Sequence, residues 1–297
     1  MSQRPELVRA YAVCEALVRS HYENFPVASR LLPRAMRPHV AAVYAFARVA
    51  DDAADEGVAP AVDRQARLAA WRAQLHDAAA GRVVPSAPPT RDELIFLALG
   101  NTIRTRNLPV ALFDDLLSAF GQDTMTKRYA SWTDVLDYCR RSANPVGRLV
   151  LRIAGYRDGQ LDRSSDALCT ALQLTNFWQD FGRDWRDGRL YVPREVAAAC
   201  GADEKDLAEG RMTAAWSAAI QRAVDFTRAL FNEGTRVCDE VRGRLRFELR
   251  LTWLGGARIL TRVERHRSRL LAYRPTLSYR DVPGLLTAAL AWPFVRS

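Results

Sequence analysis

One stretch of the chain, residues 172–184, reads LQLTNFWQDFGRD and predicts an α-helix that is apolar on most of its sides. Successive residues of an α-helix are about 100° apart, so residues at offsets of about 0, 3, 7 and 11 share one face. In this stretch those residues are Gln173, Asn176, Asp180 and Asp184. A helix that is apolar on most sides is usually buried, and carboxylates on a buried helix are unfavourable unless they are paired or bound to a metal ion. This polar face is therefore a candidate functional site.

A second stretch, residues 44–56, reads YAFARVADDAADE and has a similar spacing. The residues at offsets 0, 4, 7 and 11 are Tyr44, Arg48, Asp51 and Asp55. An α-helix places all four on one face, and the residues beside that face are small or apolar. The second stretch therefore predicts another acidic stripe on a partly buried helix.

The two acidic stripes together predict a metal site. Carboxylates four residues apart on a helix repel each other, and two such pairs around one space repel more strongly unless cations neutralise them. Ligand sets made of oxygen suit Mg²⁺ or Mn²⁺, and Mg²⁺ commonly shares its shell with substrate phosphates. We therefore expect several Mg²⁺ ions, about two or three, that bridge a bound diphosphate. Two structural ion-pair networks with nearby arginines remain the alternative.

The rest of the chain predicts helices as well. Alternation of β-branched residues with period two is nearly absent, and loops are expected at residues 84–89 and 187–193. Helices are expected near residues 5–23, 35–56, 60–80, 91–105, 109–122, 132–155, 160–186, 211–242, 245–272 and 278–293. Because no solenoid repeat or interdomain linker is visible, we expect one all-α domain over residues 1–297, with helices packed around a central space.

The composition narrows the classes of partner. Of the 297 residues 48% are apolar and 26% are charged, as in ordinary globular proteins, and the net charge of +9 favours anionic partners. Since no long basic run or zinc-finger pattern occurs, nucleic acid is the weakest candidate and we expect no nucleic-acid binding. The five cysteines form no C-x-x-C pair, which predicts free thiols in a reducing compartment.

The distribution of apolar residues predicts a cytoplasmic protein. The first ten residues lack the apolar core of a signal peptide, and no run of 18 apolar residues occurs. The most lipid-like piece is PGLLTAALAWPF, residues 283–294. It is short for a spanning helix, so it predicts either a docked C-terminal helix or a peripheral contact with the inner face of the membrane.

Three stretches of the chain resemble the squalene/phytoene synthase family of head-to-head prenyl synthases. They are residues 44–56 and two longer segments, YCRRSANPVGRLVL (138–151) and LQLTNFWQDFGRDWRDGRLYVP (172–193). The likeness extends over residues 15–280. It implies the all-α isoprenoid synthase fold with a central apolar cavity, and a prenyl diphosphate as the small-molecule substrate.

The resemblance also implies roles for individual residues. The matches to the two aspartate-rich motifs that bind Mg²⁺ and diphosphate are Asp51, Asp55, Asp180 and Asp184. The matches to residues around the diphosphate and the reacting carbons are Tyr44, Arg48, Gln173 and Asn176. Asn176 joins the four aspartates as an expected metal ligand. The further substrate-binding residues that the resemblance implies are His21, Asn24, Phe25, Tyr191 and Arg274.

Within the family, two segments are similar to the bacterial branch that serves hopanoid synthesis. They are HYENFPVASRLLP (21–33) and the ANPVG turn (143–147). Many family members have a His-Ser-Lys-Ser-Phe type segment where this chain has HYENF, and an arginine where it has Gln179. Both departures favour an enzyme that takes an already joined substrate, presqualene diphosphate, opens its cyclopropyl ring and adds water without a nicotinamide cofactor.

Two alternatives remain open. The first is condensation of two prenyl diphosphates to presqualene diphosphate, squalene or phytoene. The second is a non-catalytic relative that acts as an assembly protein, although all four motif aspartates are present.

Overall fold

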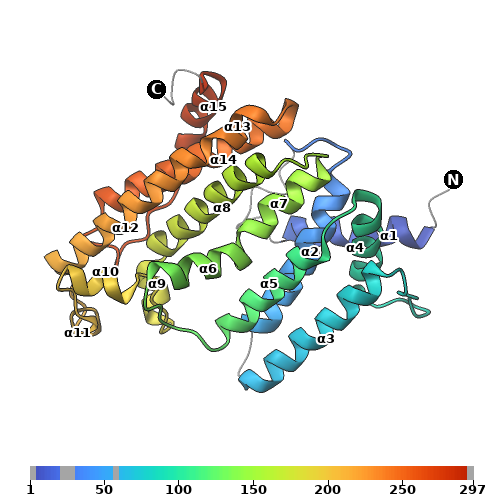
Figure 1. Cartoon of the computed structure of the whole chain (residues 1–297), viewed down its shortest axis with the longest axis horizontal. Coiled ribbons are helices and arrows are strands. Elements are labelled where there is room, and N and C mark those ends of the chain that lie inside the picture. Colours follow the sequence, from blue (N-terminus) through green and yellow to red (C-terminus); the bar gives the residue numbers. More distant parts are fainter. Residues whose placement is uncertain (1–4, 21–30, 56–59, 293–297) are drawn as a thin grey trace. The chain divides into compact units, whose positions relative to one another are not determined.

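The computed structural model describes residues 5–20, 31–55 and 60–292, and the side chain of Asp55 lies outside this description. The described residues are mostly helical and form no β-strand, with one isolated bridge between Arg128 and Leu190 (Figure 1). The prediction of an all-α fold is confirmed. The chain divides into two compact units, Met1–Met125 with Pro145–Asp158, and Thr126–Asn144 with Gly159–Ser297. The expectation of a single domain over residues 1–297 stays a prediction.

The first unit is built around one central helix. It contains α1 (Pro5–Ser20), α2 (Arg37–Asp55), α3 (Ala61–Ala79), α4 (Arg91–Arg106), α5 (Val110–Asp123) and most of α7 (Asn144–Ile153). Helix α2 packs against α1, α3, α4 and α5. Its Phe46 is fully buried among three rings, those of Trp71, Phe96 and Phe113. Burying one such side chain stabilises the fold by about 1.5–3 kcal/mol, so this cluster fixes the helix that holds the first acidic stripe.

The second unit is also built around one helix. It contains α6 (Trp132–Ser142), α8 (Gly159–Gln179), α9 (Phe181–Arg186), α10 (Arg194–Ala199), α11 (Glu204–Ala208), α12 (Ala214–Glu233), α13 (Thr235–Glu240), α14 (Gly243–Arg265), the 3-10 helix η2 (Tyr279–Asp281) and α15 (Val282–Leu290). Helix α8 packs against α6, α12, α13 and α14, and Figure 1 shows α8, α12 and α14 side by side. Trp178 of α8 is fully buried and donates its indole N–H to the hydroxyl of Thr227 at 2.9 Å. The prediction that this helix is buried on most sides is confirmed.

Three of the expected helices are broken. The helix expected at 132–155 is interrupted at Ala143, just before Pro145, which has no N–H to donate. The helix expected at 211–242 is interrupted at Gly234, where a Cβ atom would lie 2.8 Å from the backbone nitrogen of Leu168. A glycine there allows the chain to pass close to α8. The helix expected at 160–186 is interrupted at Asp180, whose ψ of 9° lies outside the helical range.

Other expected boundaries were also wrong. Residues 266–272 were expected to continue a helix, but α14 ends at Arg265 and turns follow. The carbonyls of Leu270 and Leu271 approach Gly182 of α9, a tertiary contact that overrides the local helical spacing. Helices α10 and α11 were not expected, because five or six residues are too few to show a period.

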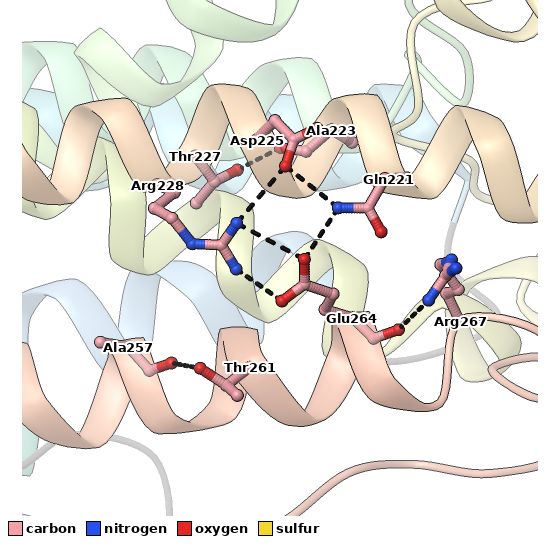
Figure 2. A network of polar contacts seen from close by, with 9 residues as sticks. All are labelled: Gln221, Ala223, Asp225, Thr227, Arg228, Ala257, Thr261, Glu264 and Arg267. Atoms are coloured by element: carbon pink, nitrogen blue, oxygen red, sulfur yellow. Dashed lines mark hydrogen bonds and ion pairs between the residues drawn. The ribbon is translucent and has the colours of Figure 1, made fainter.

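A polar network joins α12 to the end of α14 (Figure 2). The carboxylate of Glu264 accepts hydrogen bonds from Gln221 at 2.8 Å and from Arg228 at 2.6 Å. Gln221 also donates to Asp225 at 3.0 Å. The hydrogen bond from Gln221, together with Arg228, holds the pKa of Glu264 below its usual range. The network therefore joins α12 to the last turn of α14.

Two further predictions concern membrane-spanning helices and the state of the cysteines. Within residues 5–20, 31–55 and 60–292, no helix is long and apolar enough to cross a membrane. All five cysteines are free thiols, as predicted, and Cys14, Cys139 and Cys238 are buried.

Candidate active site

The first half of the candidate site lies on α2, in the first unit. The guanidinium of Arg48 reaches two carboxylates on its own helix, with Nη1 3.5 Å from Asp51 Oδ2 and Nη2 2.5 Å from Asp52 Oδ1. The spacing of three and four residues brings these side chains together, as expected for neighbouring turns of one helix. All three side chains are half-buried. The acidic end of α2 therefore has its own counter-charge.

Burial affects the Tyr44 hydroxyl and the Nε atom of Arg48. Burial is the main reason that the pKa of the Tyr44 hydroxyl is raised; the nearby Arg48 opposes this rise, and Asp52 and Asp51 add to it. The Nε atom of Arg48 is buried and has no hydrogen-bond partner among the described residues. Buried N–H groups usually have a partner, so this guanidinium has bonding capacity beyond its two carboxylates.

The second half lies at the junction of α8 and α9, in the second unit. Asp180 separates the two helices, yet its backbone N–H still donates to the Asn176 carbonyl at 2.8 Å, and the N–H of Asp184 donates to the Asp180 carbonyl at 2.9 Å. These bonds keep Asn176, Asp180 and Asp184 one helical turn apart across the break. Asn176 is exposed, whereas Gln173, Asp180 and Asp184 are half-buried. The structure thus preserves the predicted polar stripe of α8 in spite of the break.

The environment of Asp184 disfavours its ionised form. Burial, and then the charge of Asp180, raise the pKa of Asp184 to about 7, while Arg189 and Arg183 oppose the rise and Asp187 adds to it. A divalent cation between Asp180 and Asp184 would favour the ionised form of both. The donor set of this half therefore fits a hard cation such as Mg²⁺.

Asp180 has a partner from a distant part of the chain. Both carboxylate oxygens of Asp180 accept from Arg274, Oδ1 from Nε and Oδ2 from Nη2, the latter at 3.2 Å. The hydrogen bond to Asp180 raises the pKa of Arg274 above its usual value, so this side chain stays charged. Two residues that the resemblance assigned separately to diphosphate binding are thus adjacent in space.

Tyr191 belongs to an aromatic stack rather than to the acidic stripe. Its ring lies parallel to that of Phe177, with centroids 3.6 Å apart, and the ring of Tyr129 stacks near it at 5.6 Å. Tyr191 is buried. A direct role of Tyr191 in substrate binding stays a prediction.

Several predicted site residues cannot be placed. His21, Asn24, Phe25 and the side chain of Asp55 lie outside the described residues. Asp51 belongs to the first unit, and Asp180 and Asp184 belong to the second. That the two halves face one cavity stays a prediction.

Sequence reasoning missed one residue that contributes to the second half. The side chain of Gln179, noted above only as a departure from the family pattern, is buried and donates to the Pro275 carbonyl at 2.6 Å. The partners are 96 positions apart, and no local pattern indicates such a contact.

The described residues form no all-protein metal cage. Within the described ranges, no group of three or more His, Cys, Asp or Glu side chains could hold a metal ion. Mg²⁺ usually takes one or two carboxylates from the protein and completes its shell with water and phosphate oxygens. Paired carboxylates such as Asp180 and Asp184 therefore suit Mg²⁺ that is delivered with a phosphorylated ligand.

Comparisons with known proteins show which proteins the chain is similar to. The family model described as squalene/phytoene synthase matches residues 18–281. The chain is 40% identical over 215 residues to the hydroxysqualene synthase of Zymomonas mobilis, a match that covers 72% of this chain and 69% of that protein. It is 34% identical over 221 residues to the hydroxysqualene synthase of Rhodopseudomonas palustris, covering 74% of this chain and 72% of that protein.

Solved structures give a similar result. The squalene synthase HpnC from Alicyclobacillus acidocaldarius superposes with a TM-score of 0.81 at 43% identity, over 89% of this chain and 97% of that one. A dehydrosqualene synthase in complex with a ligand gives a TM-score of 0.83 at 24% identity, over 97% of this chain and 98% of that one, and bears on the fold alone.

Proposed function

The chain belongs to the squalene/phytoene synthase family, and on this premise we propose that it is a hydroxysqualene synthase. The main support is its identity of 34–40% with relatives of that name, over more than two thirds of both chains. The four aspartates of the acidic stripes are all present in the sequence, which favours a catalytic over an assembly role.

The proposed reaction converts presqualene diphosphate and water into hydroxysqualene and diphosphate. The carbon–oxygen bond to the diphosphate breaks, and its electron pair leaves with the diphosphate. The resulting cyclopropylcarbinyl cation opens to an allylic cation, to which the oxygen of water then bonds. The proton lost by that water passes to solvent or to the released diphosphate. Because no electrons are transferred to or from a redox partner, the reaction requires no nicotinamide.

The residues proposed to hold Mg²⁺ are Asp51, Asp55, Asn176, Asp180 and Asp184. When bound, Mg²⁺ supplies neutralisation of the charge that develops on the leaving diphosphate. The arginines provide the same kind of stabilisation by hydrogen bonds, because a planar guanidinium matches phosphate oxygens. Arg48 serves this role on α2, and Arg274 serves it beside Asp180.

Tyr44 is the residue that we propose to stabilise the carbocation. It is half-buried on the face of α2 that holds Arg48 and Asp51. Because burial raises the pKa of its hydroxyl, the ring stays neutral at physiological pH. An aromatic face contributes about 0.5–2 kcal/mol to a nearby cation.

The deciding experiment is incubation of the full chain with presqualene diphosphate and Mg²⁺, without a nicotinamide, followed by identification of the product. Hydroxysqualene is the expected product, and the Asp180→Asn variant is the matched inactive control. A second incubation contains farnesyl diphosphate alone. Formation of presqualene diphosphate from it, or of squalene only when NADPH is added, would identify a condensing enzyme instead. No product in either incubation would favour the assembly protein.

We further propose a cytoplasmic location with a peripheral contact between the C-terminal region and an anionic membrane surface. Exposed large apolar side chains gather there at Tyr273, Leu277, Tyr279, Val282, Leu286 and Leu290. The last four recur every three or four residues, so they share one face of η2 and α15. This apolar face would enter the headgroup region and offer a very apolar product a short route into lipid.

The charges around this face match anionic lipid. Residues 258–290 contain seven arginines and two acidic residues. Both acids are paired, Glu264 with Arg228 at 2.6 Å and Asp281 with Arg262 at 2.5 Å. The local excess of positive charge would therefore attract anionic headgroups.

Sedimentation with vesicles tests the membrane contact. The full chain is expected to sediment with vesicles that contain phosphatidylglycerol, and less with pure phosphatidylcholine. A Leu286→Asp/Leu290→Asp variant should lose this binding. The matched control is Val62→Asp/Val84→Asp, which alters two exposed apolar residues of the first unit. Equal sedimentation of both double variants would refute the contact through α15.

A further inference from the structure

After α14, residues 266–277 run back across the junction of α8 and α9, and we call them the crossing segment. Leu270 of this segment is buried. A Cβ atom on Gly182 of α9 would lie 2.6 Å from the Leu270 carbonyl oxygen, and the Leu271 carbonyl is closer still. Arg186 of α9 also donates to the Leu271 carbonyl, at 3.4 Å. The first half of the crossing segment is therefore in direct backbone contact with α9.

The second half of the crossing segment is held by side-chain donors. Arg262 of α14 donates to the carbonyl of Thr276. Gln179, the last residue of α8, donates from Nε2 to the carbonyl of Pro275 at 2.6 Å. Gln179 is only 9% exposed, so little water competes for this bond. Because proline has no N–H, this carbonyl is the sole backbone group through which Pro275 can be hydrogen-bonded.

Two consecutive residues at the α8–α9 junction contact two consecutive residues of the crossing segment. Gln179 holds Pro275, and the next residue, Asp180, binds the preceding residue, Arg274. Because Gln179 fixes the Pro275 carbonyl, it also restrains the backbone of Arg274, the residue before Pro275. A side chain as long as arginine loses much rotamer entropy when it is ordered, and a fixed backbone reduces that loss.

We propose that Gln179 is a positioning residue, which acts by fixing the Pro275 carbonyl so that Arg274 is held at Asp180 with free donors for the diphosphate. The described contacts with Asp180 use two of the five N–H donors of the guanidinium. The Arg274 side chain is 47% exposed, so the other donors are accessible to phosphate oxygens. This proposal rests on the proposed function only in taking a diphosphate as the ligand of this half.

A double-mutant cycle tests the proposal, with inorganic diphosphate and Mg²⁺ as the probe and isothermal titration calorimetry of the full chain as the readout. The variants are Gln179→Met, Arg274→Met and the two combined. Loss of one hydrogen bond that organises the site should weaken diphosphate binding about tenfold in Gln179→Met. Because Gln179 acts through Arg274, the combined variant should bind no more weakly than Arg274→Met alone.

The control for losing a side-chain amide is Gln221→Met, which removes the half-buried donor to Glu264 at 2.8 Å and to Asp225 at 3.0 Å, at another place in the same unit. This control should keep the diphosphate affinity of the parent. Gln179→Leu, which removes the donor without adding a charge, is the second variant if Gln179→Met does not fold. Unchanged affinity in the folded Gln179 variant would overturn the proposal, and so would losses that multiply in the combined variant.

The binding readout separates this proposal from the proposed function. A parent chain that binds Mg²⁺ and diphosphate but makes no hydroxysqualene would refute the function and leave the cycle interpretable. A parent that makes hydroxysqualene, with a Gln179 variant of unchanged diphosphate affinity, would refute the positioning role alone.

Discussion

The acidic motifs of α2 and of the α8–α9 junction have similar residues but obtain their counter-charge in different ways. On α2 the helix is continuous, and Arg48 pairs with both Asp51 and Asp52 from within the same two turns. At the α8–α9 junction the helix breaks at Asp180, and the cation comes from Arg274, 94 positions further along the chain. The first motif is therefore a property of one helix, and the second is a property of the tertiary structure.

This difference has an energetic consequence. A motif whose counter-ion lies on the same helix keeps its arrangement whenever the helix forms, and α2 is fixed by the buried cluster around Phe46. The second motif also requires the crossing segment to be in place. The negative charge of the second motif is also only partly balanced, since burial and the charge of Asp180 raise the pKa of Asp184 to about 7. We expect the second motif to be the more sensitive of the two to changes outside it.

The largest effect is expected from loss of a motif aspartate. Asp180→Asn and Asp51→Asn should each lower kcat by about 10³-fold or more, since each removes charge that the metal–diphosphate complex requires. Both side chains are partly exposed, so the melting temperature should change little. Steady-state kinetics and circular dichroism melts measure the two quantities. Retained activity in either variant would count against the metal assignment of that half.

Loss of Arg48 is expected to have the next largest effect. Arg48→Met should reduce kcat/KM by about tenfold to a hundredfold, because charged hydrogen bonds to the leaving group are lost. Arg48→Lys keeps the charge without the planar fork, so its loss should be smaller. Kinetics on presqualene diphosphate compares the two. If neither variant changes kcat/KM, Arg48 serves only as the partner of Asp51 and Asp52.

Gly182→Ala tests the dependence of the second motif on the crossing segment. A Cβ atom there would overlap the carbonyls of Leu270 and Leu271, so the free energy of unfolding should fall by about 2 kcal/mol. In the first unit, Gly121→Ala is the control, because its Cβ would meet only a Leu68 methyl group at 3.9 Å. That substitution should leave stability unchanged or raise it by up to about 1 kcal/mol. Denaturant unfolding measures both, and equal losses would contradict the contact.

The smallest effect concerns pH and the helix of the first motif. His39 of α2 lies beside Thr102 Oγ1 at 3.0 Å, and burial, together with the charge of Arg106, lowers its pKa to about 4. The folded protein therefore keeps His39 neutral at a pH where the unfolded chain, with an ordinary pKa of about 6.5, binds a proton. Titration of His39 should leave the free energy of unfolding unchanged above about pH 6.5 and should lower it as the pH drops from about 6.5 towards 4. His39→Gln should melt with a weaker dependence on pH over this range, and an unchanged dependence would contradict the assignment.

The sequence was a better guide to the first motif than to the second. Ion pairs three and four residues apart are local, so the arrangement of Arg48 with its acids follows from helical spacing alone. The boundaries expected for that helix, 35–56, differ little from Arg37–Asp55. In the second motif the spacing of Asn176, Asp180 and Asp184 was predictable, because it depends on backbone turns that survive the break.

The rest of the second motif depends on contacts that no local pattern encodes. Neither proline nor glycine marks the break at Asp180, and the residues after Arg265 keep a spacing that is compatible with a helix. The contacts of Gln179 with Pro275 and of Asp180 with Arg274 span 96 and 94 positions. One cue was visible, the glycine at 182 within an apolar helix, which often marks a close approach of another backbone.

The contact of Gln179 with a main-chain carbonyl has an evolutionary consequence. Every amino acid has such a carbonyl, so this contact does not depend on which side chain stands at position 275. The neighbouring contact joins two side chains, so it requires both Asp180 and Arg274. A chimera between two relatives should retain the site only when residues 179–186 and 266–277 are inherited from the same parent.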